Sequence, residues 1–283
     1  MTLAGAEVPA GPPLQPFLDR ALALAQQAGV GLLAQRAAAA GTVMQKGRRR
    51  ELVTAADRAA EQVVVGGLRA AHPEHAILAE EGVLTTAGEV DKAADWTWIV
   101  DPLDGTTNFV HGLPFFAVAI ALAHRGVPVV GVVHAPALGE TFFGARGLGA
   151  FRRWADGREQ RLTVSRTHEL ADALLATGFS YNRNEPGRDD NSARLTAVLP
   201  HCRDLRRLGS AELDLCLVAA GVYDGYWELY LAPYDVAAGA VLVQEAGGTV
   251  TDLAAGGDWL FGGQVLASNG ALHAELLRVL NRR

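Results

Sequence analysis

Residue types are distributed along this chain in two ways, which predict both helices and strands. Long stretches rich in Ala and Leu, with polar residues spaced among them, are typical of helices. The sequence predicts helices over residues 14–40, 54–71, 210–220, 234–246 and 271–280. Thr54 is the expected N-cap of the second helix because Asp57 follows at capping-box spacing, and Pro73 should end that helix.

Short apolar runs bounded by turn sequences predict strands between these helices. The runs cover residues 77–79, 96–100, 115–123, 127–134, 141–144, 150–153, 174–178 and 205–208. Strands mixed with helices favour layered α/β or α+β packing. We expect a flexible tail over 1–13, an N-terminal half over 14–155 and a C-terminal half over 156–283, with one cleft between the halves.

Composition narrows the class of protein. A length of 283 residues suits one large domain or two abutting subdomains. The net charge of −6 argues against general nucleic-acid binding. Cys202 and Cys216 form neither a metal-ligand spacing nor a disulfide framework, which favours a reducing, cytoplasmic setting. We find no signal-peptide pattern and no apolar run long enough to span a membrane. No two histidines have H-x-x-x-H spacing, so we expect no zinc site.

The strongest chemical signal lies where the apolar run Trp98-Ile99-Val100 meets Asp101 and Asp104. Buried carboxylates at a strand end are costly unless a cation neutralises them, and paired carboxylates suit Mg²⁺. The turn that follows, 105–107, can offer backbone N–H groups and a hydroxyl to an anion. A metal beside an oxyanion site indicates metal-assisted phosphoryl chemistry.

Other carboxylates also fall at the ends of predicted elements. Asp57 and Asp235 lie at helix starts, and Glu80 and Glu81 follow a strand. Taken alone, such residues are ordinary helix caps or a solvated turn. Their clustering with Asp101 at strand ends favours a ligand site, because open α/β sheets bind ligands there.

These segments resemble the motifs of the inositol monophosphatase family, whose members are Mg²⁺-dependent, lithium-sensitive phosphatases. Residues 101–109 match D-P-(I/L)-D-G-(T/S)-x-N-(F/Y) throughout. Residues 234–239 resemble W-D-x-(A/S)-(A/G)-G, with Tyr in place of Trp. Residues 52–57 resemble L-V-T-x-x-D, and 79–81 resemble G-E-E with Ala in place of Gly. The resemblance runs from about residue 43 to 269 and implies a layered αβαβα sandwich of the sugar-phosphatase type, α/β (α+β) in class.

The resemblance also implies a set of metal ligands. One Mg²⁺ would be held by Glu80, Asp101 and the Leu103 carbonyl. A second would be held by Asp101, Asp104 and Asp235. The family pattern allows a third, weaker Mg²⁺ near Glu80. Lys46 matches a family lysine near the metals, but it also belongs to a basic run that solvent can cover, and both interpretations stay open.

Catalytic and substrate roles follow from the same resemblance. Water on the first metal, which Glu80 helps to hold, would be the nucleophile, and Thr106 paired with Asp57 would orient and help deprotonate it. The turn would present N–H groups to the phosphate at a helix N-terminus. The residues expected to contact substrate are Asp104, Gly105, Thr106, Thr107, Ser210, Ala211 and Glu228.

Substrate choice leaves alternatives. Thr107 together with Glu228 favours a polyol phosphate, with inositol 1-phosphate as the first choice. Fructose 1,6-bisphosphate is the main alternative, and histidinol phosphate is a weaker one. Glu212 is unusual for the family and either alters the pocket or faces solvent.

A non-catalytic role is the alternative from another class. The basic segments 46–50 and 203–207 might contact RNA or an acidic protein, although solvated surface is the simpler interpretation for an acidic chain. The resemblance also predicts a homodimer.

Overall fold

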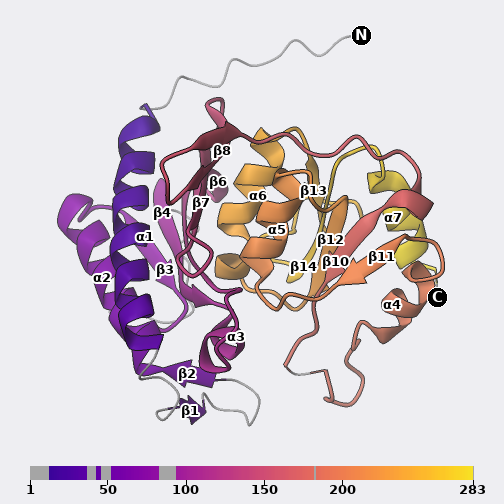
Figure 1. The fold of residues 1–283 in the computed structure, drawn as a ribbon, viewed down its shortest axis with the longest axis horizontal. Helices are drawn as coiled ribbons and strands as arrows, with labels where there is room; N and C mark the ends of the chain where they lie inside the picture. The colour runs from indigo at the N-terminus through magenta and orange to yellow at the C-terminus, as the bar shows by residue number, and fades with distance from the viewer. Residues whose placement is uncertain (1–12, 37–42, 46–51, 83–93, 182, 283) are drawn as a thin grey trace.

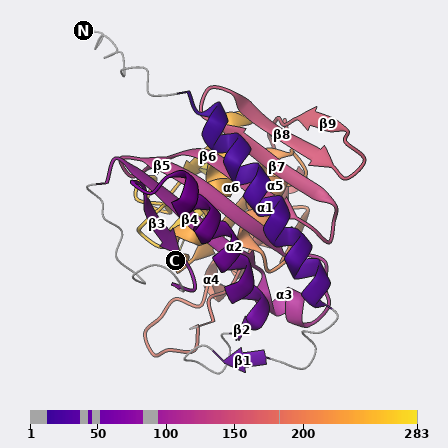
Figure 2. The same ribbon diagram turned by 90° about the vertical axis from the view of Figure 1, so that its left-hand side faces the viewer.

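The computed structural model describes residues 13–36, 43–45, 52–82, 94–181 and 183–282. Its helices and strands form five layers (Figure 1). The first layer holds α1 (Gln15–Arg36) and α2 (Ala55–Ala71), which cover one face of a seven-stranded sheet (Figure 2). This arrangement confirms the predicted αβαβα sandwich.

The seven-stranded sheet has the order β3-β4-β5-β6-β7-β8-β9. Its strands are β3 (Ala76–Ala79), β4 (Trp96–Asp104), β5 (Ala117–His124), β6 (Val127–Ala135), β7 (Glu140–Ala145), β8 (Gly149–Trp154) and β9 (Glu159–Arg161). Only β3 and β4 pair in parallel; the remaining neighbours are antiparallel. Strand β5 is buried along nearly its whole length because helices cover both faces of the sheet there, which explains its unbroken apolar sequence.

Helices α5 (Ala211–Ala219) and α6 (Ala237–Glu245) form the middle layer, between the two sheets. A Cβ at Gly131 on β6 would lie 2.4 Å from the Ala238 carbonyl oxygen, so glycine lets α6 pack directly on the strand. This close approach fixes the start of α6, and with it the segment that carries Asp235, against the first sheet.

The second sheet has the order β11-β10-β12-β14-β13. Its strands are β10 (Leu174–Thr177), β11 (Asp204–Arg206), β12 (Gly225–Leu229), β13 (Thr249–Thr251) and β14 (Gln264–Ser268). Helices α4 (Ser192–Val198) and α7 (His273–Leu280) lie on its outer side. Short elements complete the chain: β1 (Val43–Gln45), β2 (Leu52–Thr54), α3 (Thr106–Val110), and the 3₁₀ turns η2 (Leu170–Asp172) and η3 (Pro233–Asp235).

Several predicted boundaries need correction. The predicted strand 96–100 continues through both aspartates to Asp104. The predicted helix 234–246 opens with the 3₁₀ turn η3, and its α-helical part starts only at Ala237. We did not predict α4, β9, β12, β13 or β14. Of these, β9 and β13 have only 3 residues each, too few for periodicity to separate them from loops. Residues 37–40 of the first predicted helix lie outside the described residues.

The first sheet continues to Arg161 because β9 pairs with β8, while α5 and α6 contact strands of both sheets. The division of the chain into halves at residue 155 stays a prediction. Among the described residues, no helix has the length and apolar character needed to cross a membrane.

Candidate active site

A cavity of about 220 Å³ opens where β4, α3, α5, β12 and η3 meet. Ten of the predicted site residues line it: Glu80, Asp101, Leu103, Asp104, Gly105, Thr106, Ser210, Ala211, Glu228 and Asp235. Asp57 and Thr107 do not line the cavity, but each is hydrogen-bonded to a residue that does. The fold therefore gathers residues from segments more than 150 positions apart.

A bulge in β4 explains how Asp101 and Asp104 serve one cavity. Residues three apart on a regular strand point to opposite faces. Here Asp101 pairs with Ala119 and Asp104 pairs with Ala117, so three steps on β4 match two on β5. This irregularity re-aims the side chains, and both carboxylates line the same space.

Asp104 is anchored by the N-terminus of α5. Its carboxylate accepts hydrogen bonds from Ser210 Oγ at 2.5 Å, from the Glu212 N–H at 2.9 Å and from the Ala211 N–H at 3.2 Å. Burial raises the pKa of Asp104, although these hydrogen bonds oppose the change. The Asp104 carboxylate thus links β4 of the first sheet to the N-terminus of α5 in the middle layer.

Asp101 and Asp235 complete a crowded acidic centre. Asp101 is 2% exposed and accepts a hydrogen bond from the Leu103 N–H at 2.9 Å. Asp235, in η3, accepts one from the Ala232 N–H at 2.6 Å. Burial raises the pKa of both aspartates well above the usual range, and the charge of Glu80 raises them further.

This acidic centre fits a hard divalent cation. Buried carboxylates that repel one another are stabilised by a cation that all of them contact. Leu103 also lines the cavity, and its carbonyl oxygen, which lies within hydrogen-bond distance of the Thr106 hydroxyl, would add a neutral oxygen donor. Oxygen donors of this kind are the ligands that Mg²⁺ prefers.

Thr106 lies beside the acidic centre at the start of α3. Its hydroxyl donates to Asp57 Oδ1 at 3.1 Å and lies 3.2 Å from the Leu103 carbonyl oxygen. Asp57 is buried on α2, so the first helical layer reaches the site through this contact. Gly105 has φ of 87°, and a Cβ there would lie 2.8 Å from the Phe115 carbonyl oxygen, so the tight turn requires glycine.

Glu228 lines the cavity from β12. It accepts a hydrogen bond from the Tyr226 hydroxyl at 2.6 Å. Burial raises the pKa of Glu228 to about 7, with the Tyr226 hydrogen bond and the positive charge of Arg207 opposing that rise. Its carboxylate therefore changes charge near neutral pH.

Sequence reasoning did not place Tyr181, Tyr226 or Arg207 at the cavity. Tyr181 pairs with the Thr107 hydroxyl at 3.2 Å, and Tyr226 holds Glu228, but neither lies in a recognisable motif. Arg207 lines the cavity, although the sequence placed it only in a basic run. Glu212 is buried and accepts hydrogen bonds from the N–H groups of Ala238 at 3.1 Å and Gly239 at 2.5 Å, so it neither faces solvent nor lines the pocket.

Lys46 and the basic segment 46–50 lie outside the described residues. In the second basic segment, Arg203 pairs with Asp172 and Arg206 pairs with Asp204. These ion pairs reduce the positive charge that 203–207 offers to an acidic partner.

Comparison with known proteins agrees with this geometry. A sequence model of the inositol monophosphatase family matches residues 14–283. A Nus factor SuhB from Pseudomonas aeruginosa is 41% identical over 94% of this chain and 96% of its own. An inositol-1-monophosphatase from Synechocystis is 42% identical over 84% of this chain and 79% of its own.

Solved structures agree as well. An inositol monophosphatase from Anabaena superposes with a TM-score of 0.82 at 43% identity, covering 94% of this chain and 96% of that chain. The extragenic suppressor protein suhB from Bartonella henselae gives a TM-score of 0.85 at 37% identity, covering 94% and 99%. The chain belongs to the inositol monophosphatase family, a phosphatase family.

Proposed function

We propose that this protein is a Mg²⁺-dependent phosphomonoesterase that hydrolyses inositol 1-phosphate to myo-inositol and phosphate. The observation that carries the proposal is the group of four carboxylates around one cavity, Glu80, Asp101, Asp104 and Asp235, of which Asp101 and Asp104 are buried. Mutual repulsion among these carboxylates favours binding of divalent cations. Relatives named inositol-1-monophosphatase support the substrate.

The proposed ligands are Glu80, Asp101 and the Leu103 carbonyl for one Mg²⁺, and Asp101, Asp104 and Asp235 for a second. A third ion near Glu80 remains part of the proposal. When bound, these ions neutralise the carboxylates, lower the pKa of water and polarise phosphoryl oxygens.

The chain's own groups would then position the reactants. Thr106, held by Asp57, orients a water toward phosphorus, and Asp57 accepts the proton that the Thr106 hydroxyl passes on. The backbone N–H groups of 105–107 direct their positive ends toward the phosphate and stabilise its negative charge. Glu228 accepts hydrogen bonds from substrate hydroxyls, beside Ser210 and Ala211.

The test is a substrate panel. Phosphate release is measured from inositol 1-phosphate, fructose 1,6-bisphosphate, histidinol phosphate and 3′-phosphoadenosine 5′-phosphate, at varied Mg²⁺, with and without Li⁺. We expect Mg²⁺-dependent turnover with the highest kcat/KM for inositol 1-phosphate. Hydrolysis of none of them at any Mg²⁺ concentration would contradict the proposal.

Fructose 1,6-bisphosphate is the second candidate, because a cavity with two arginines adjoins the first. This neighbouring cavity is lined by Phe179, Arg183, Asp190, Ser192 and Arg207, so it holds two guanidinium groups and one carboxylate, and Arg207 and Phe179 also line the active-site cavity. A substrate with a second phosphate would gain from these guanidinium groups. If that is the preferred substrate, Arg207→Gln lowers kcat/KM for the bisphosphate more than for inositol 1-phosphate.

Glu228 should give the reaction a distinctive pH dependence. With a pKa of about 7, the fraction of ionised Glu228 rises about tenfold from pH 6 to pH 8. We expect kcat/KM for inositol 1-phosphate to rise through neutral pH as the carboxylate becomes able to accept hydrogen bonds from two hydroxyls. Glu228→Gln should remove this rise, and because it keeps every other titrating group, the ratio of the two profiles isolates Glu228.

The same group predicts a stability change of known sign. The pKa of Glu228 in the folded protein lies above its unfolded value of 4.5. Its favourable contribution to the free energy of unfolding is therefore fully present below pH 4.5 and is lost as pH rises through about 7. The metal-free Glu228→Gln variant should therefore show a flatter Tm profile than wild type across this window. Parallel profiles for both proteins would contradict the raised pKa.

A binding role beside catalysis is the candidate from another class, because several relatives are named Nus factor SuhB. The test is complementation of a deletion strain by Asp104→Asn. Loss of complementation supports turnover as the essential role, while full complementation by a catalytically dead protein supports the binding role.

The remaining proposals concern setting and assembly. We propose a homodimer, lithium sensitivity and a cytoplasmic location. The free cysteines Cys202 and Cys216 support a reducing compartment.

A further inference from the structure

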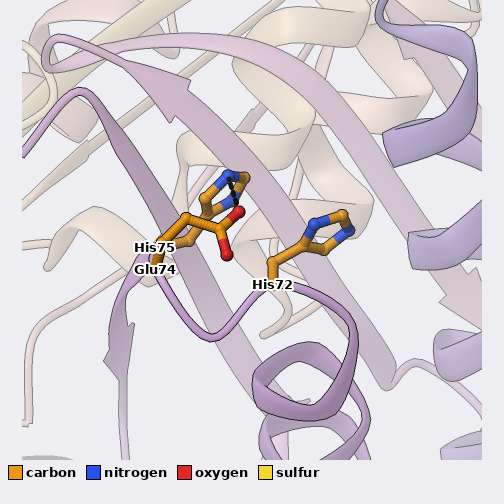
Figure 3. A group of neighbouring side chains, drawn as sticks. All are labelled: His72, Glu74 and His75. Carbon is orange, nitrogen blue, oxygen red and sulfur yellow. Dashed lines mark ion pairs between the residues drawn. The ribbon is translucent and has the colours of Figure 1, made fainter.

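Three metal-ligating side chains meet at the turn between α2 and β3: His72, Glu74 and His75 (Figure 3). One ligand atom from each lies within 4.8 Å of the other two. The turn precedes β3, and the four residues of that strand, about 13 Å long, separate it from Glu80 at the active site. The group is therefore distinct from the acidic centre. The two histidines have H-x-x-H spacing, which differs from H-x-x-x-H.

The local backbone brings the side chains together. Pro73 follows the end of α2, and the His75 N–H donates to the His72 carbonyl oxygen at 3.1 Å. The two imidazole rings stack with centroids 4.8 Å apart and planes 13° from parallel. Glu74 Oε1 lies 3.2 Å from His75 Nε2. A short, proline-containing turn thus supplies all three donors.

His75 is the buried, fixed member of the group. Its side chain is 5% exposed, and its Nδ1 has no hydrogen-bond partner in the part of the chain that the structure describes. Burial lowers the pKa of His75, with the neighbouring His72 acting in the same direction and Glu74 opposing it. The ring can offer a metal either its Nδ1 or the Nε2 that lies beside Glu74.

Aromatic side chains from two other elements hold the imidazoles in place. Phe17 on α1 packs on both rings, with centroid distances of 5.2 Å to His72 and 5.6 Å to His75. Trp96 on β4 stacks on His75 at 5.9 Å. These contacts cover the two imidazoles on their apolar side and leave the Glu74 carboxylate on the solvent side.

From this arrangement we propose that His72, Glu74 and His75 bind a divalent transition-metal ion, with Zn²⁺ as the best match. Two imidazoles and one carboxylate suit Zn²⁺ and do not suit Mg²⁺, which prefers oxygen donors alone. Tetrahedral Zn²⁺ needs ligand atoms about 3.3 Å apart, so the His72 and Glu74 side chains would move toward His75 when the ion binds. Glu74 is free to do so because its side chain is 67% exposed. Water completes the fourth position.

The bound ion would clamp the end of α2 to the start of β3. Its effect is on local stability and does not depend on the proposed phosphatase activity. The test titrates Zn²⁺ into the purified full-length protein by calorimetry in excess Mg²⁺, which competes for the oxygen-rich acidic centre. We expect one Zn²⁺ site in the wild type and a rise in Tm on binding.

The double variant His72→Gln/Glu74→Gln should lose at least about 100-fold in Zn²⁺ affinity, together with the rise in Tm. Glu74→Gln alone, at an exposed position, should also weaken binding. The control His168→Gln/Glu169→Gln changes an exposed histidine–glutamate pair elsewhere and should bind Zn²⁺ as wild type does. Wild-type affinity in the double variant overturns the site, as does loss of Zn²⁺ binding in Asp101→Asn instead.

Discussion

Asp101→Asn is expected to lower kcat for Mg²⁺-dependent phosphate release at least about 10³-fold, because it removes a proposed ligand shared by two cations. The amide can still lie in the same space, but it carries no charge to hold a cation. The Leu103 N–H still has an oxygen to donate to, so the local turn should persist. This variant should therefore lose activity while it keeps its fold.

The same substitution should change thermal stability in the opposite direction to activity when no metal is present. Burial and the charge of Glu80 raise the pKa of Asp101. Ionising Asp101 in the folded, metal-free protein therefore destabilises it, and this loss of stability develops as pH rises above 3.8, the ordinary pKa of aspartate. Asparagine carries no such cost. Without Mg²⁺ at neutral pH, the Tm of Asp101→Asn should equal or exceed that of wild type, while added Mg²⁺ should raise the Tm of wild type more.

The measurement combines steady-state kinetics with thermal unfolding in a chelator and in Mg²⁺. Asp95→Asn is the matched control, because this aspartate is 66% exposed and pairs with Arg125 on the surface. It should change neither kcat nor the Mg²⁺ effect on Tm. A wild-type kcat for Asp101→Asn would overturn the shared-ligand assignment.

Glu212→Ala is expected to be the most destabilising substitution near the site, at roughly 3 kcal/mol or more. The carboxylate is fully buried and accepts hydrogen bonds from the N–H groups of Ala238 and Gly239 at the start of α6. Alanine leaves both donors without these acceptors and creates a cavity. Since α6 follows Asp235 directly, KM for Mg²⁺ should rise as well.

Glu245→Ala is the control for Glu212→Ala. Glu245 also accepts backbone N–H groups, from Gly147 and Gly149, but at a partly exposed turn where water can replace it. Chemical denaturation should show a much smaller loss for Glu245→Ala, with unchanged KM for Mg²⁺. Glu212→Gln, which retains one acceptor oxygen, should lie between wild type and alanine. Equal losses at 212 and 245 would show that the buried contact has no special role.

Local sequence was most informative where one element carries the signal. The run into Asp101 predicts a strand, and the structure contains it as β4. It was least informative for Glu212, whose role depends on α6, a helix that begins 25 residues later. No local pattern around Glu212 reports which backbone groups will face it.

The sequence by itself determined the family, the layered fold and the set of carboxylates, because each motif is contiguous and its residue types limit the chemistry that follows. Only the tertiary structure decided how those residues meet. The bulge in β4 lets the side chains of Asp101 and Asp104 face the same cavity, and the contact of Gly131 with Ala238 fixes α6 beside them. It also decided that Glu228 has a pKa of about 7, since burial is set by packing between distant segments. Strand pairing and desolvation are long-range effects, so a local reading of residues does not contain them.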